Sequence, residues 1–221
     1  MGIGAVVFDM DGLMVNSEPV WHVVTAEVFA KVGIQLEMPD LLATTGLRLQ
    51  DTVARHLSKF TPKETVTPEE LMKGIKDGMV AKMRAEASPM PGLLSALNFF
   101  KSKNVPMAVA SSSPVELIDA TLECLKITSY FDHKISALDE EYGKPHPGVY
   151  IKAAKLCGVS PLECLALEDS VTGCLAAKSA RFKCISVPDT FLNADKSKYA
   201  FTDAVLESLD QVNEQLWQDL R

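Results

Sequence analysis

The chain has 221 residues, of which 47% are hydrophobic and 23% charged, and its net charge is −7 at pH 7. This length is enough for one sizeable core plus an insertion, and the acidic balance argues against a surface for nucleic acid or an anionic membrane. The five cysteines include no C-x-x-C pair, so neither a zinc site nor a disulfide framework is expected. The first apolar run is too short for a signal peptide or a membrane span, and we expect a cytoplasmic protein.

The first predicted element is a buried strand over residues 3–9, and two carboxylates stand at its end. The apolar run leads directly into Asp9-Met10-Asp11-Gly12. Because strand residues alternate in direction, Asp9 and Asp11 should project to the same side, at the edge where open α/β sheets bind ligands. One of them could then attack an electrophile while the other moves a proton. An ordinary Asp-Gly turn would also give this tetrapeptide.

From residue 18 to residue 87 the pattern is helical and shows no strand. Helices are predicted over 20–32, 50–60 and 69–87, the last of them opened by the capping box Thr67-Pro68-Glu69-Glu70. We predict that residues 18–87 form a helical domain inserted into a core of residues 1–17 and 88–221. Hinges are expected near 15–18 and 87–91.

Strands and helices alternate through the rest of the chain. The predicted strands cover 105–111, 133–137, 163–168 and 183–187, and the predicted helices cover 92–103, 114–125, 146–157 and 171–180. Such alternation favours right-handed βαβ units. The expected fold is therefore α/β, a doubly wound parallel sheet of Rossmann-like type with an inserted helical domain.

Polar groups also follow later predicted strands. Three segments carry them: Ala108–Ser113 with its three serines, Gly143–Pro147 with Lys144, and Leu165–Ser170 with Glu168 and Asp169. Each has an ordinary explanation when taken singly. Ser113 fits the N-cap of the helix that follows, which is the interpretation we favour, and Ser170 fits another cap. An isolated lysine such as Lys144 is usually a solvated loop cation.

The order Asp-x-Asp-Gly, Ser after the second core strand, Lys-Pro and Glu-Asp-Ser-x-x-Gly spans nearly the whole chain. In this combination the sequence resembles the haloacid dehalogenase-like (HAD) superfamily, most closely the branch of β-phosphoglucomutases and small sugar phosphatases. The segment Ser17–Trp21 is similar to that of bacterial hexose- and hexitol-phosphate phosphatases. The resemblance implies a HAD-like core, and it implies that residues 18–87 are a mobile cap.

The resemblance also implies roles in phosphoryl transfer. Asp9 would be the nucleophile that becomes an aspartyl phosphate, and Asp11 the general acid and base. Because a carboxylate repels a phosphate dianion, cations must lie between them, and Lys144 would be one of these cations. Ser111, and Ser112 through its backbone N–H, would hold the phosphate oxygens.

A bound Mg²⁺ ion is the second cation that the resemblance implies. Its ligands would be the Asp9 side chain, the Asp11 backbone carbonyl and Asp169. Glu168 would be either a further ligand or a neighbour that supports the ligands.

Substrate contacts are expected from the helical domain. The run Thr44–Arg48 resembles the specificity loop of the family's cap, which makes Gly46 and Arg48 candidates, although such an arginine is as often exposed to solvent. Trp21 and Ser113 are further candidates for the cleft. For Trp21, packing in the first cap helix is the favoured alternative.

These observations predict a Mg²⁺-dependent phosphomonoesterase that hydrolyses small sugar or polyol phosphates. A sugar phosphomutase is the alternative. It is weakened because β-phosphoglucomutase-like chains carry a His where this one, aligned without gaps, has Trp21 followed by His22. A phosphate-sensing protein without turnover is less favoured, because all the catalytic groups are present. The expected partner is a small phosphate ester, with neither nucleic acid nor membrane, and we expect a monomer.

Overall fold

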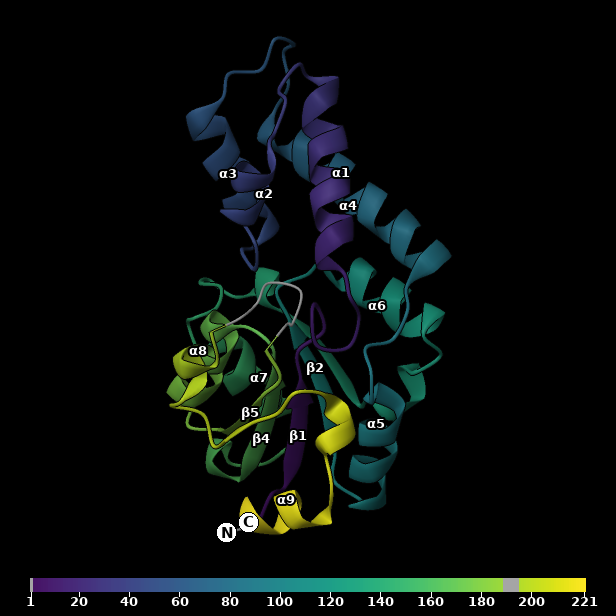
Figure 1. The fold of residues 1–221 in the computed structure, drawn as a ribbon, viewed down its shortest axis with the longest axis vertical. Helices are drawn as coiled ribbons and strands as arrows, with labels where there is room; N and C mark the ends of the chain where they lie inside the picture. Colours follow the sequence, from purple (N-terminus) through teal and green to yellow (C-terminus); the bar gives the residue numbers. More distant parts are fainter. Residues whose placement is uncertain (1, 189–194) are drawn as a thin grey trace.

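The computed structural model describes residues 2–188 and 195–221, which form a sheet flanked by helices with a helical block beyond one end (Figure 1). Within these residues the sheet has six parallel strands in the order β3-β2-β1-β4-β5-β6. They are β1 Ala5–Phe8, β2 Met107–Ser111, β3 His133–Ser136, β4 Cys164–Glu168, β5 Lys183–Ser186 and β6 Ala204–Val205. The five predicted strands are confirmed, and the two-residue edge strand β6 was missed.

Helices connect the strands and build the block. They are α1 Glu18–Lys31, α2 Met38–Leu42, α3 Leu49–Lys59, α4 Pro68–Glu86, α5 Leu93–Ser102, α6 Val115–Cys124, α7 Gly148–Leu156, α8 Val171–Ser179 and α9 Glu214–Asp219. Short 3-10 helices cover Thr128–Tyr130, Ala137–Asp139, Pro161–Glu163, Lys196–Tyr199 and Leu209–Gln211. All predicted helices are confirmed; α2 and α9 were missed because they are too short to show a periodicity. None of the described helices combines the length and apolar character needed to cross a bilayer.

The central strand β1 is apolar throughout because both of its faces are buried. Val6 and Phe8 belong to the core cluster that includes α5 and α6, whereas Ala5 and Val7 belong to the cluster that includes α7 and α8. Phe8 meets Phe100 of α5 edge to face, with ring centroids 5.8 Å apart. Helices on both faces of a parallel sheet confirm the doubly wound α/β fold.

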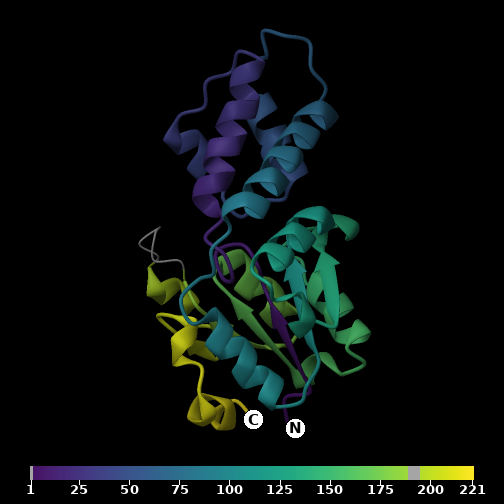
Figure 2. The same cartoon turned by 90° about the vertical axis from the view of Figure 1, so that its right-hand side faces the viewer.

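Helices α1 to α4 gather in the block beyond the sheet (Figures 1 and 2). The last of them starts at the predicted capping box. The Thr67 hydroxyl accepts the Glu70 N–H at 3.2 Å, and the Glu70 carboxylate accepts the Thr67 N–H at 2.8 Å. This box satisfies backbone donors that the first turn of α4 would otherwise leave unpaired.

The chain enters and leaves the helical block through two neighbouring segments. Val15 forms a β-bridge with Pro89, and the Met90 N–H donates to the Met14 carbonyl at 2.9 Å. Both segments lie between regular elements, where the hinges are predicted.

Candidate active site

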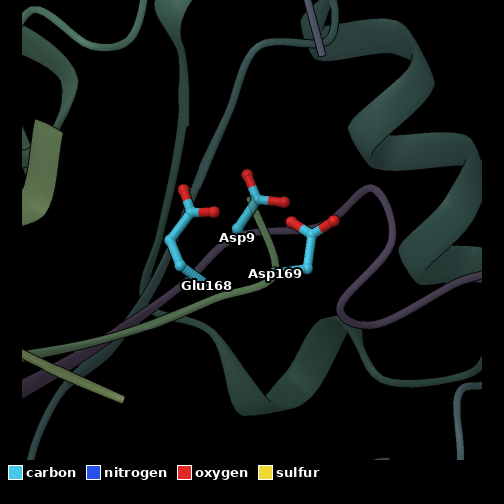
Figure 3. A group of neighbouring side chains, drawn as sticks. All are labelled: Asp9, Glu168 and Asp169. Carbon is cyan, nitrogen blue, oxygen red and sulfur yellow. The ribbon is translucent and has the colours of Figure 1, made fainter. Parts of the chain in front are cut away.

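Three carboxylates meet where β1 and β4 end. These strands are neighbours, with Phe8 paired to Leu167, so Asp9 stands beside Glu168 and Asp169. One carboxylate oxygen from each of the three acids lies within 4.8 Å of those of the other two. Figure 3 shows the three side chains pointing to the same side of the strand ends. The structure thus brings together the acids that the sequence analysis selected.

Lys144 is buried among acceptors and is not a solvated loop cation. Its Nζ donates to Asp9 Oδ1 at 2.5 Å, to Glu168 Oε1 at 2.6 Å and to the Ala110 carbonyl at 2.9 Å. Burial alone would lower the pKa of Lys144, but the two carboxylates outweigh burial and raise it. The side chain therefore stays an ammonium ion beside Asp9.

Both oxygens of Glu168 are engaged by groups of the chain itself. Oε1 accepts hydrogen bonds from Lys144 and from the Tyr150 hydroxyl at 2.6 Å, and Oε2 accepts from the Ser170 hydroxyl at 3.2 Å. A Cβ at Gly173 would lie 1.9 Å from Oε1, so the first turn of α8 fits closely around this carboxylate only with glycine there. Ser170 also caps α8 by accepting the Gly173 N–H at 3.0 Å, as predicted.

Asp169 presents a carboxylate with no hydrogen-bond donor among the described residues. Burial, followed by the charges of Asp9 and Glu168, raises the pKa of Asp169 well above its ordinary value. Burial also raises the pKa of Asp9, against the opposing effect of Lys144. The cluster thus holds more negative charge than one lysine balances.

A hard cation suits this cluster, because carboxylate oxygens are the ligands that Mg²⁺ prefers. A Cβ at Gly12 would come within 2.2 Å of Asp169 Oδ2, so glycine at this position leaves the space that the carboxylate occupies. The donor set of Asp9 and Asp169 therefore fits the predicted metal.

Asp11 is held by four hydrogen-bond donors that come from two parts of the fold. Ser17 Oγ and Trp21 Nε1 donate to Oδ1 at 2.6 and 3.1 Å. Ser111 Oγ and Ser113 Oγ donate to Oδ2 at 3.1 and 2.7 Å. One oxygen is thus oriented by the entrance to the helical block and the other by the end of β2.

The predicted N-cap role of Ser113 is wrong. Helix α6 begins after Pro114 without a side-chain cap, because the Ser113 hydroxyl is directed to Asp11 instead. Trp21 is partly buried against the core, as its packing alternative predicts, but its indole N–H also reaches Asp11. Sequence reasoning missed Ser17 and Tyr150, and the Ser17–Trp21 resemblance was the one signal that pointed near Ser17.

A cavity of about 270 Å³ opens over these groups. Its lining combines Asp9, Asp11, Ser112, Lys144, Asp169, Ser170, Val171, Thr172 and Tyr199 of the core with Glu18, Thr45 and Gly46 of the helical block. Gly46 therefore lies where the sequence placed it. Arg48 is not part of this lining. Its Nε pairs with Asp51 at 2.8 Å, and its Nη1 donates to the Glu141 carbonyl at 3.4 Å.

Comparison with known proteins identifies the family to which this chain belongs. A family model described as a haloacid dehalogenase-like hydrolase matches residues 3–181. The chain belongs to this family. Hexitol phosphatase B of Escherichia coli (strain K12) is 32% identical over 212 residues, which cover 94% of this chain and 93% of that protein. The chain is an enzyme of this hydrolase class, a HAD-type phosphatase.

Solved structures agree on the fold. CbbY from Rhodobacter sphaeroides in complex with phosphate has a TM-score of 0.88 at 25% identity, over 99% of this chain and 100% of that one. A β-phosphoglucomutase from Clostridium difficile has a TM-score of 0.82 at 24% identity, over 98% and 96% of the two chains. At that identity the second likeness concerns the fold alone.

Proposed function

We propose that this chain is a Mg²⁺-dependent phosphomonoesterase that hydrolyses small sugar or polyol phosphates through an aspartyl phosphate on Asp9. The observation that carries the proposal is the placing of Asp9 between an ammonium and a second carboxylate, with Lys144 Nζ 2.5 Å away and Asp169 facing it. Phosphoryl transfer needs a nucleophile, charge neutralisation and a group that carries a proton. Asp11 is proposed as the group that carries the proton.

In the first step an Asp9 oxygen attacks phosphorus while the bond from phosphorus to the ester oxygen breaks. Asp11 gives its proton to the departing alkoxide, and the alcohol leaves. Water then attacks the aspartyl phosphate and passes a proton to Asp11, which releases inorganic phosphate and restores the Asp9 carboxylate. The four donors around Asp11 hold its carboxylate in place for this second step.

We propose that the phosphate oxygens are bound by Ser111, by the backbone N–H of Ser112 and by Lys144. In this structure the Ser111 hydroxyl donates to Asp11 and accepts the Ser113 N–H at 2.9 Å, so its engagement with a phosphate requires it to change partner. Ser112 lines the cavity and its hydroxyl has no hydrogen-bond partner among the described residues. It is thus placed to contact a ligand.

Mg²⁺ would be held by the side chains of Asp9 and Asp169 and by the Asp11 carbonyl. It would supply charge neutralisation for the phosphate oxygens in addition to that of Lys144. Glu168 is proposed to support the ligands and not to bind the ion, since both its oxygens already accept hydrogen bonds from Lys144, Tyr150 and Ser170.

Residues 18–87 are proposed to act as a cap on a core of residues 1–17 and 88–221. The support is that Glu18, Thr45 and Gly46 of the block share one cavity with the core acids. A cap that closes over the site keeps bulk water from competing with the substrate before the aspartyl phosphate forms.

The sugar or polyol class is supported by the relative named hexitol phosphatase B, which matches the chain nearly end to end. A phosphomutase would return the phosphoryl group to a second hydroxyl of the sugar. Trp21 stands at the position where mutase-like chains carry a His, and its indole N–H donates a hydrogen bond to Asp11. This difference favours hydrolysis over transfer to a second hydroxyl.

Turnover of p-nitrophenyl phosphate with Mg²⁺ and with EDTA tests the proposal. Asp9→Asn should abolish turnover. Asp11→Asn should lower the rate about 10²- to 10⁴-fold through loss of the general base that the second step requires, because the p-nitrophenolate leaving group needs no proton. Asp219→Asn, at an exposed position of α9, is the matched control. Radiolabelled phosphate should become attached to Asp9 during turnover. Near-normal rates in both site variants, or phosphate binding without any turnover, would refute the scheme.

A further inference from the structure

Asp169 differs from Asp9 in how its carboxylate is held. Lys144 donates to Asp9 at 2.5 Å, whereas no described residue donates a hydrogen bond to the carboxylate of Asp169. Gly12 bounds this carboxylate on one side, because a Cβ there would lie 2.2 Å from Asp169 Oδ2. The direction in which Asp169 faces a bound Mg²⁺ must therefore be set largely through its backbone.

The hydroxyl of Tyr199 holds that backbone. It donates to the main-chain carbonyl of Asp169 at 2.8 Å. This carbonyl belongs to the planar peptide that joins Asp169 to Ser170, and Ser170 in turn caps α8 by accepting the Gly173 N–H at 3.0 Å. Because the peptide is held at its oxygen and at the residue that follows, the main chain at Asp169 has little freedom to rotate.

Tyr199 is itself anchored to the core. Its side chain is buried among residues of α7 and α8, and it also lines the larger cavity beside Asp169. Its carbonyl accepts the N–H and the hydroxyl of Thr202 at 2.9 and 2.8 Å, and the Thr202 hydroxyl lies 3.1 Å from that of Ser186 in β5. A tyrosine has only two side-chain torsions, so a packed ring fixes the place of its hydroxyl. Through Tyr199, the backbone of Asp169 is tied to the neighbouring strand β5.

From these contacts we infer that Tyr199 is a positioning residue for the metal site: it fixes the backbone of Asp169 and so aims the carboxylate at Mg²⁺. The inference rests on the proposed function and adds to it a residue that no sequence motif selected. Groups that orient metal ligands typically contribute 10- to 100-fold to metal affinity. Since Tyr199 acts on the ligand through the backbone, we expect an effect at the lower end of this range.

A hydroxyl with a purely structural role would give a different result. A carbonyl shielded from water needs a hydrogen-bond partner, and Tyr199 would then do no more than supply one. Loss of the hydroxyl would lower Tm to the same extent with and without Mg²⁺. Loss of a positioning group also reduces the gain in Tm that a given Mg²⁺ concentration provides, because the Kd for the ion rises.

Tyr199→Phe tests the inference, because it keeps the ring and removes only the hydroxyl. Thermal unfolding over a series of Mg²⁺ concentrations, without substrate, gives the Kd for Mg²⁺. This Kd should rise about tenfold in the variant. The Mg²⁺ concentration for half-maximal turnover of p-nitrophenyl phosphate should rise by the same factor. Tyr130→Phe is the matched control: it removes a hydroxyl that donates to Asn98 at 2.8 Å ahead of β3, at the other end of the strand from the site, and should leave the Kd unchanged.

Two outcomes overturn the inference: an unchanged Kd for Mg²⁺ in Tyr199→Phe, whatever its Tm in EDTA, or an equal rise of the Kd in Tyr130→Phe. In both cases Mg²⁺-dependent turnover of p-nitrophenyl phosphate by the wild type shows that the proposed function survives. A wild type whose Tm does not respond to Mg²⁺ and which turns over no ester refutes the proposed function itself, and the inference with it.

Discussion

Replacing Asp169 by Asn changes the charge of the acidic cluster while keeping its shape. The clustered carboxylate oxygens lie within 4.8 Å of one another. At about that separation two like charges repel by roughly 3 kcal/mol in an effective dielectric of 20. Asp169 faces two such charges, and attraction to Lys144 cancels part of the repulsion. We therefore expect Asp169→Asn to raise the free energy of unfolding of the metal-free protein by about 1–3 kcal/mol.

Thermal unfolding in EDTA and in Mg²⁺ measures this effect. For a chain of this size each kcal/mol shifts Tm by about 2–4 °C, so the variant should melt above the wild type in EDTA. Mg²⁺ at a hundred times its Kd should stabilise the wild type by about 2.7 kcal/mol and the variant much less. With Mg²⁺ the variant should therefore melt at the same temperature as the wild type or below it. Glu64→Gln, an exposed loop change, should respond to Mg²⁺ as the wild type does. A variant that melts below the wild type in EDTA, or an equal gain from Mg²⁺ in both proteins, would refute the reasoning.

Three further predictions concern neighbouring groups. Since the folded pKa of Asp169 is raised above its ordinary value near 3.8, its contribution to stability is fully present below that value and is lost as pH rises through the raised pKa. The advantage of Asp169→Asn in EDTA should therefore grow with pH in urea unfolding, and a constant advantage would contradict this. Tyr150→Phe removes a buried 2.6 Å hydrogen bond to Glu168 and should lower the free energy of unfolding by about 1.5–3 kcal/mol, whereas unchanged urea curves would count against it. Trp21→Phe removes a donor to Asp11 and should lower kcat/KM for a sugar phosphate more than for p-nitrophenyl phosphate, whose leaving group needs no proton; equal losses would disprove the positioning role.

Much of the fold could be predicted because its signals are local. The apolar runs that become β1, β2 and β4 are long enough to be recognised in the sequence. Strand geometry alone then predicts that the acids and hydroxyls at their ends lie at one edge of the sheet. The site residues Asp9 and Lys144 are far apart in the sequence. Asp9 directly follows β1, and Lys144 lies in the connection that follows β3, so both come from the carboxyl ends of strands in one parallel sheet. The short elements α2, α9 and β6 gave too little pattern to be seen.

The partners of the site residues could not be predicted, because they depend on how distant elements pack. Tyr150 looks like one more core residue of α7, and its hydroxyl acquires a role because α7 lies beside the end of β4, at Glu168. Likewise, the donors to Asp11 from Ser17 and Trp21 depend on where α1 begins relative to β1. No spacing rule in the sequence encodes that position.

The wrong prediction for Ser113 has a physical explanation. Local rules favour its hydroxyl as a cap, which would satisfy a backbone N–H at the start of α6. The structure leaves α6 without a side-chain cap and directs the hydroxyl to Asp11 at 2.7 Å. A hydrogen bond to a charged acceptor is the stronger of the two, so the exchange favours the partly buried carboxylate of Asp11 over the exposed start of α6. Local rules fail most often where a fold gives up stability in an element to position a reacting group, and Ser113 is therefore expected to matter more for turnover than for the stability of α6.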